Sequence, residues 1–80
     1  MKTWSVYIVR CKDHSLYTGI ALDVEQRIAK HNSGDGAKYT RSRQPVKLVR
    51  TEVYKSESKA RKREMEIKSW TKQQKENLIS

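Results

Sequence analysis

Polar and apolar residues alternate in two short runs near the start of the chain, which is the pattern of β-strands. In residues 4–11, the even positions share one face and the odd positions share the other. A second run, residues 16–20, contains Gly19, and a glycine inside a strand often marks a bulge or a close backbone approach. The polar residues 12–14 between the runs are few enough for a hairpin.

The length of the hairpin connection decides which side chains share a face. A three-residue connection pairs Cys11 with Ser15 and Tyr7 with Gly19, which places Tyr17 on the same face as Tyr7. A two-residue connection would place the two tyrosines on opposite faces. We expect the first arrangement, with Gly19 opening space between the phenols.

Signals for helices follow the hairpin. Asp23 fits an N-cap, with Gln26 three residues later, and predicts a helix that runs to about His31. Residues 33–45 combine glycine with basic side chains and are expected to form a loop. The other expected elements are a valine-rich strand over 46–54, a helix from Ser56 or Ser58 to about Trp70, and a short helix after the capping box Thr71–Gln74 that offers Leu78 and Ile79 for packing.

We expect a single domain over residues 1–80, of the α+β class. The third strand should complete a three-stranded antiparallel sheet flanked by helices, in the order β-β-α-β-α-α. Eighty residues bury only about 60–65% of the surface that the unfolded chain exposes, so the core is thin. A catalytic site on such a domain has to be shallow and close to the surface.

The charge of the chain narrows the class of partner. Eighteen Lys and Arg against nine Asp and Glu give a formal net charge of +9. A polyanion is the simplest partner for such an excess, and nucleic acid is favoured over a membrane because no segment combines a basic face with a broad apolar one. A merely soluble basic protein stays an alternative. One cysteine, Cys11, and no apolar run of the length of a signal peptide favour a reduced, cytoplasmic setting.

Glu64 is the most informative single residue. It lies between Ala60 and Ile67 on the apolar stripe of the helix expected over 56–70. An unpaired buried carboxylate is costly, so Glu64 should have a cationic partner or a metal ion, and the sequence leaves an ion pair with an arginine and a metal site equally open. A lone carboxylate suffices for Mg²⁺, which takes its other ligands from water and substrate phosphate.

Other side chains fit the chemistry of a phosphodiester. Arg27 and His31 share a helix stripe at spacing i, i+4, where Arg27 could bind a phosphate and His31 could orient water or pass a proton. Each is equally consistent with a surface or helix-capping role. Tyr7 and Tyr17 are ordinary strand residues unless their hydroxyl groups meet near a cation, where a tyrosine loses its proton more readily.

The expected loop carries a cluster suited to nucleic acid, with cationic side chains for the backbone and an aromatic ring for base stacking. A solvated basic loop would look the same. The cluster consists of Lys38, Tyr39, Arg41 and Arg43.

Taken in order, these residues resemble the GIY-YIG nuclease superfamily. The first motif is Val6-Tyr7-Ile8, and Tyr17-Thr18-Gly19 follows with the two tyrosines ten residues apart. The later motifs are matched by Arg27 and His31 and by Glu64, so the resemblance spans roughly residues 4–70. The runs His31–Gly34 and Lys38–Arg41 are similar to those of the small stand-alone bacterial members.

The resemblance implies one divalent cation, Mg²⁺ or Mn²⁺, with Glu64 as its only protein ligand. It implies that Tyr7 takes the proton of the attacking water, that Tyr17 positions water or phosphate, and that Arg27 binds the scissile phosphate with help from His31. Hydrolysis would leave a 3′-hydroxyl and a 5′-phosphate.

The chain departs from the family pattern in four respects. Val6 replaces a glycine and Thr18 replaces an isoleucine, but both changes leave the tyrosines and Gly19 in place. Family members often carry a late asparagine that braces the site, and Asn77 is the loose candidate here. The extra domain with which larger relatives choose a target has no counterpart.

We therefore expect a monomeric, metal-dependent endonuclease that acts on DNA, with branched or flapped DNA as a candidate substrate and repair or recombination as its setting. One alternative is a basic nucleic-acid-binding module with the same fold and little or no catalytic activity. Another is a catalytic fragment that works only with a protein partner, which would supply target specificity.

Overall fold

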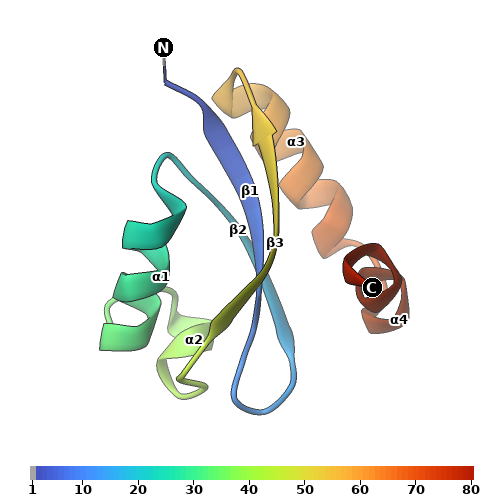
Figure 1. Ribbon diagram of the computed structural model, residues 1–80. Helices are drawn as coiled ribbons and strands as arrows, with labels where there is room; N and C mark the ends of the chain where they lie inside the picture. The colour runs from blue at the N-terminus through green and yellow to red at the C-terminus, as the bar shows by residue number, and fades with distance from the viewer. Residues whose placement is uncertain (1) are drawn as a thin grey trace.

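The architecture is a three-stranded antiparallel sheet between two layers of helices (Figure 1). The structure is a computed structural model that describes residues 2–80, so the first residue of the domain expected over 1–80 lies outside it. The elements are β1 (Trp4–Arg10), β2 (Leu16–Ala21), α1 (Val24–Ser33), α2 (Lys38–Arg41), β3 (Lys47–Tyr54), α3 (Glu57–Lys68) and α4 (Lys72–Ile79).

The sheet has β1 at its centre, with strand order β2-β1-β3. The amide nitrogen of Cys11 donates to the carbonyl oxygen of Ser15 at 2.8 Å, which closes a three-residue connection. Tyr7 pairs with Gly19, and Tyr17 pairs with Val9. The predicted register is therefore confirmed, and the two tyrosines share a face of the sheet.

Each face of β1 is covered by its own apolar cluster. On one face, Val6 and Ile8 are buried with Ala60 and Ile67 of α3, and Leu78 of α4 packs against them. On the other face, Tyr7, Val9, Cys11, Ala21 and Val46 are buried, with Tyr17, Val24 and Ile28 beside them. Because both faces are covered, all five residues inside β1 are buried, which suits a central strand of a three-layer fold.

The predicted class and sheet are confirmed, and the element order needs one correction. The expected loop over 33–45 contains the single-turn helix α2, so the order is β-β-α-α-β-α-α. Several boundaries also move by one or two residues: α1 continues to Ser33, β3 begins at Lys47, and α3 ends at Lys68. Such shifts are usual because helix ends fray and apolar periodicity does not mark the last residue.

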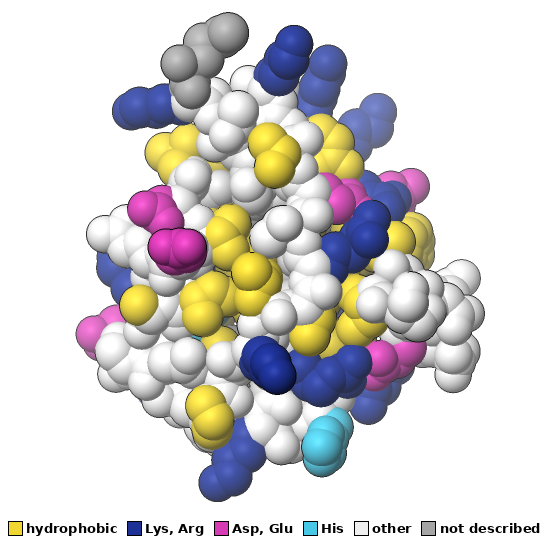
Figure 2. All heavy atoms as spheres, in the orientation of Figure 1, with side chains coloured by type: hydrophobic (Ala, Val, Ile, Leu, Met, Phe, Trp, Pro, Cys, Tyr) yellow, Lys and Arg dark blue, Asp and Glu magenta, His cyan; other side chains and the backbone are white. Residues whose placement is uncertain are grey.

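The surface carries the excess positive charge of the composition. Figure 2 shows Lys and Arg side chains at both ends of the visible face and along its α3 side, with fewer Asp and Glu side chains between them. Over residues 2–80, no helix has both the length and the apolar character needed to cross a membrane.

Candidate active site

Tyr7 lies at the centre of the candidate site. Its side chain is 1% exposed, and its hydroxyl oxygen lies 2.8 Å from Nε2 of His31. The ring passes directly over Gly19, where an added Cβ would stand 2.5 Å from the hydroxyl oxygen and 2.7 Å from Cζ. The glycine is therefore required for close approach, as its place inside a strand suggested.

His31 is held from its other side. The residue is the buried member of α1, and its Nδ1 lies 2.7 Å from Oγ1 of Thr40, which is also fully buried. A Cβ added at Gly36 would overlap the imidazole, so the chain after α1 presses against the ring. Thr40 belongs to α2, within the segment expected to be a loop, and was not among the residues predicted from sequence. A single turn is too short to show helical periodicity, so no signal marked it.

Tyr17 completes the aromatic side of the site. Its ring centroid lies 5.4 Å from that of His31 in an edge-on arrangement and 5.8 Å from that of Tyr39 in a stacked one. Nζ of Lys68 lies 5.6 Å from the centre of the Tyr17 ring. Both tyrosines therefore meet the same histidine, and α3 reaches this side of the sheet through Lys68.

Glu64 lies on the stripe of α3 that faces the sheet, with its side chain 13% exposed. Its ion-pair partner is Lys68 at 3.5 Å, and not an arginine. Among the described residues, no group donates a hydrogen bond to this carboxylate. Its oxygens are thus shielded from bulk solvent and still have room for further ligands.

Burial, together with the neighbouring charges, shifts the pKa values of Tyr7 and His31 in the direction that favours their neutral forms. Burial raises the pKa of the Tyr7 phenol far above its usual value, and Tyr17 and Glu64 raise it further, whereas Arg27 lowers it. Burial lowers the pKa of His31, and Arg27 lowers it again. Glu64 and Arg27 therefore lie close enough to act on the same phenol.

Arg27 is exposed on α1, one turn before His31. Within residues 2–80 no carboxylate pairs with it, so its guanidinium is available to a phosphate. Tyr7 and Tyr17 thus both contact His31, and Arg27 and Glu64 are charged residues near enough to influence the pKa of Tyr7.

The basic cluster divides into two parts. Arg43 donates to Asp13 Oδ2 at 3.0 Å and to the carbonyl oxygen of Tyr39 at 2.8 Å, and its guanidinium lies 4.0 Å from the centre of the Tyr39 ring. Because Tyr39 also stacks on Tyr17, its ring has neighbours already and is a poor platform for a base. Lys38 and Arg41 are exposed and, over the described residues, form no ion pair.

Asn77 lies apart from this group. It is exposed on α4, where its Oδ1 accepts from Nε2 of Gln73 at 3.0 Å. In the described part of the chain no contact joins it to Tyr7, His31 or Glu64. The structure therefore gives it no role in bracing the site.

A hollow next to the site was not foreseen from the sequence. It has a volume of about 200 Å³ and is lined by Ser15, Leu16, Tyr39, Lys72 and Lys75. The two lysines come from α4, whose sequence showed only helix-capping and packing signals. They join Lys68 in a row of cations beside the Tyr17–Tyr39 stack.

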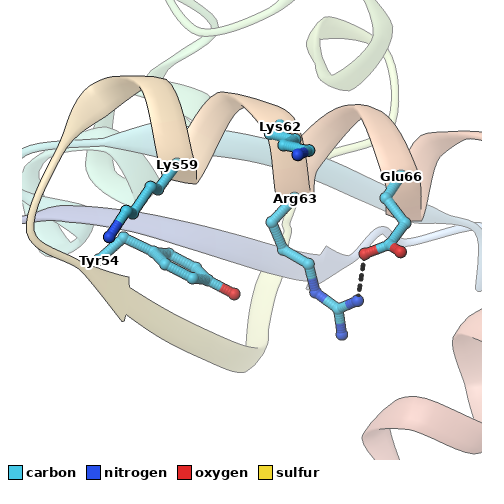
Figure 3. Close-up of a pocket in the computed structure, with 5 residues that line it drawn as sticks. All are labelled: Tyr54, Lys59, Lys62, Arg63 and Glu66. Atoms are coloured by element: carbon cyan, nitrogen blue, oxygen red, sulfur yellow. Dashed lines mark hydrogen bonds and ion pairs between the residues drawn. The ribbon is translucent and has the colours of Figure 1, made fainter.

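A larger hollow of about 310 Å³ lies on the other flank of α3 (Figure 3). In this view Lys59, Arg63 and Glu66 project from the helix, and the ring of Tyr54 lies below Lys59 and to one side of Arg63. Arg63 is neutralised by Glu66 at 2.5 Å and by Glu52 at 2.8 Å, an arrangement that lowers the pKa of Glu52 to about 2. This hollow is lined by neither tyrosine of the hairpin and by none of Arg27, His31 and Glu64.

The protein ligands available here suit a divalent cation that takes most of its ligands from water. No group of three or more His, Cys, Asp or Glu side chains that could hold a metal ion occurs in residues 2–80. Zinc-type coordination is not built here, whereas Mg²⁺ and Mn²⁺ accept one carboxylate together with water and phosphate oxygens. Glu64, with no hydrogen bond donated to it and a partner only at 3.5 Å, fits that single-ligand role.

The fold and this arrangement define a class of protein. A model of the GIY-YIG catalytic domain matches residues 3–77, and the chain belongs to the GIY-YIG nuclease family. Its relatives are UPF0213 proteins, small stand-alone members of that family. It is 59% identical over 75 residues to the UPF0213 protein of Staphylococcus saprophyticus, covering 94% of this chain and 92% of that protein.

Two solution NMR structures have the same fold. A UPF0213 protein from Bacillus halodurans matches with a TM-score of 0.63 and 48% identity, covering 96% of this chain and 82% of that one. A protein from E. faecalis matches with a TM-score of 0.67 and 40% identity, covering 99% and 84%. GIY-YIG nucleases generally use divalent metal ions, which agrees with the donor set around Glu64.

Proposed function

We propose that the protein is a metal-dependent endonuclease that hydrolyses phosphodiester bonds in DNA. The observation that carries the proposal is the convergence of Tyr7, His31, Arg27 and Glu64. The phenol lies 2.8 Å from the imidazole, and its pKa responds to both the guanidinium and the carboxylate. A phosphate placed among these groups would meet a base, a cation and a metal ligand together.

Each residue has a role that follows from its chemistry. A divalent cation held by Glu64 would polarise the phosphoryl group and stabilise the leaving oxygen. Arg27 binds the scissile phosphate through its planar N–H donors and offsets the charge that develops during in-line attack. Tyr7 accepts the proton of the attacking water, and Tyr17 positions that water or a phosphate oxygen.

The protonation of Tyr7 in the absence of metal explains why it would act as a base only when metal and substrate are bound. Burial raises the pKa of the Tyr7 phenol, and Tyr17 and Glu64 raise it further, so the proton stays on Tyr7 without metal. Glu64 would hold a divalent cation, whose positive charge would lower the pKa of the phenol and favour the phenolate. The base would therefore be formed where substrate and metal are both present.

The nucleic acid would extend from the site over basic residues of α2 and α4. Lys38 and Arg41 are exposed and free to contact phosphates, and Lys72 and Lys75 line a hollow that Tyr39 also lines. The net charge of +9 favours such a partner. We propose branched or flapped DNA as the preferred form, in repair or recombination, and a cytoplasmic monomer as the acting species.

The test is incubation of the purified protein with labelled single-stranded, duplex and branched DNA, with Mg²⁺, with Mn²⁺ or with a chelator. We expect cleavage that needs the cation and leaves 5′-phosphate and 3′-hydroxyl ends. Binding without cleavage across the panel would overturn the proposal in favour of the binding module. Cleavage that persists in chelator would overturn the metal dependence.

A further inference from the structure

Three buried polar side chains form a continuous chain of short contacts. The hydroxyl oxygen of Tyr7 lies 2.8 Å from His31 Nε2, His31 Nδ1 lies 2.7 Å from Thr40 Oγ1, and Thr40 Oγ1 lies 3.0 Å from the carbonyl oxygen of Ala37. The exposed fractions of Tyr7, His31 and Thr40 are 1%, 1% and 0%. Solvent therefore has little access to these side chains, and the groups have to satisfy one another.

The Ala37 carbonyl group, at the end of this series of contacts, favours one direction for the hydrogen bonds. The carbonyl oxygen of Ala37 can only accept, and the hydroxyl of Thr40 has one hydrogen to give. When Thr40 donates to Ala37, its oxygen accepts from Nδ1–H of His31. Nε2 of His31 then has no hydrogen and accepts from the hydroxyl of Tyr7.

The opposite direction replaces one of these short hydrogen bonds with a long one. Thr40 would donate to Nδ1 and give up its 3.0 Å bond to Ala37, and Nε2–H would donate to Tyr7. The only added partner for Nδ1 is the amide nitrogen of Ala37, which is 3.4 Å away and at the outer limit for such a bond. The first arrangement keeps three contacts of 3.0 Å or less, and the second keeps two.

We propose that Thr40 is a positioning residue, which holds His31 in the tautomer with its proton on Nδ1 and so leaves Nε2 as the acceptor for the phenol proton of Tyr7. The consequence for catalysis rests on the proposed function, but the tautomer itself does not. When Tyr7 forms its phenolate, the bond from its oxygen to hydrogen breaks and a bond from that hydrogen to Nε2 forms. The resulting imidazolium keeps its Nδ1–H bond to Thr40.

With its proton on Nδ1, His31 can accept the phenol proton of Tyr7 at Nε2, which the other tautomer cannot do. With a hydrogen on Nε2, the imidazole could donate to Tyr7 but could not take its proton. Thr40 would then act on the reaction only through the histidine, and without touching substrate. A hydroxyl at position 40 is required, whereas the methyl group serves packing alone.

The tautomer is read directly by ¹⁵N NMR of the imidazole nitrogens in the metal-free protein, at a pH where His31 is neutral. We expect Nδ1 to carry the proton in the wild type and in Thr40→Ser, which retains the hydroxyl. In Thr40→Val, which has the same shape without the donor and acceptor, the proton should shift at least in part to Nε2. A wild-type spectrum with the proton on Nε2 would overturn the inference even if Thr40→Val fails to fold.

Cleavage assays test the catalytic consequence separately. We expect kcat to fall about tenfold or more in Thr40→Val, with KM little changed, and to recover in Thr40→Ser. Full activity in Thr40→Val, despite a changed tautomer, would overturn the role of Thr40 and leave the nuclease proposal standing. A wild type that cleaves nothing would overturn the nuclease proposal, while the NMR result still decides the tautomer.

Discussion

At the scale of single residues, the candidate site depends on two places where a side chain is absent. Gly19 lets the Tyr7 ring lie against the neighbouring strand, and Gly36 lets the backbone after α1 close on the His31 ring. Without these glycines the phenol and the imidazole could not occupy their present positions. The 2.8 Å contact between them is therefore set by backbone as much as by the side chains themselves.

Gly19→Ala should displace the Tyr7 ring. The new methyl group would stand 2.5 Å from the hydroxyl oxygen, in a fully packed face of the sheet, and overpacking of this kind costs about 1–3 kcal/mol. We expect a lower midpoint of thermal unfolding and a large change in the NMR signals of His31. A Gly19→Ala protein with unchanged stability and unchanged His31 signals would show that the ring is not held there.

The buried His31 should make stability depend on pH. Its pKa in the folded protein is below the ordinary value of 6.5, so on acidification the unfolded chain binds a proton before the folded one does. The free energy of unfolding should fall as the pH drops from about 7 towards 5, by at most about 1.4 kcal/mol per pH unit for one proton. Urea unfolding at a series of pH values measures this change.

The matched control for that experiment is the other histidine, which is exposed. His14→Gln should keep the pH dependence because it retains His31, whereas His31→Gln should lose it. Equal slopes in these two variants would assign the effect to other groups.

At the scale of elements, the sequence predicted the parts that have strong periodicity. The hairpin, its register and the face shared by Tyr7 and Tyr17 follow from alternation and from a three-residue connection. The position of Glu64 on the inner stripe of α3 follows from helical spacing. These features are local, so sequence patterns determine them.

The parts that sequence did not predict depend on contacts between distant segments. Helix α2 is one turn long, and Thr40 matters only because α1 brings His31 against it. Lys72 and Lys75 matter because α4 lies next to Tyr39 and the hairpin. For Glu64 the sequence left an ion pair with an arginine and a metal site equally open, and the ion-pair partner in the structure is Lys68.

The lysines of α4 should contribute more to DNA binding than those of the opposite flank of α3. We expect Lys72→Gln with Lys75→Gln to weaken binding and to reduce the dependence of log Kd on log salt concentration by about two. Lys59→Gln with Lys62→Gln removes the same charge from the hollow of Figure 3 and is the matched control. Fluorescence titrations at several salt concentrations compare them, and equal weakening would contradict a path over α4.

At the scale of the whole molecule, the site joins the two helical layers. Tyr7, Tyr17 and His31 belong to the apolar cluster and helix on one face of the sheet, and Glu64 comes from α3 on the other. Lys68 of α3 lies over the Tyr17 ring, so the layers meet at the β2 side of the sheet. In the proposed mechanism, neither layer alone would contain the base, the phosphate-binding cation and the metal ligand. A thin core is compatible with this proposal, because the groups belong to two layers that meet at the β2 side of the sheet and need no deep cavity.

The proposed nuclease site depends on the Glu64 carboxylate as its metal ligand, and a cleavage assay of Glu64→Ala examines this role. Glu66→Ala removes the same charge from the same helix, on the flank paired with Arg63, and is the control. With Mg²⁺ and one labelled DNA substrate, we expect Glu64→Ala to bind DNA about as well as the wild type and to lose cleavage, while Glu66→Ala retains both. Cleavage by Glu64→Ala at the wild-type rate would contradict the account.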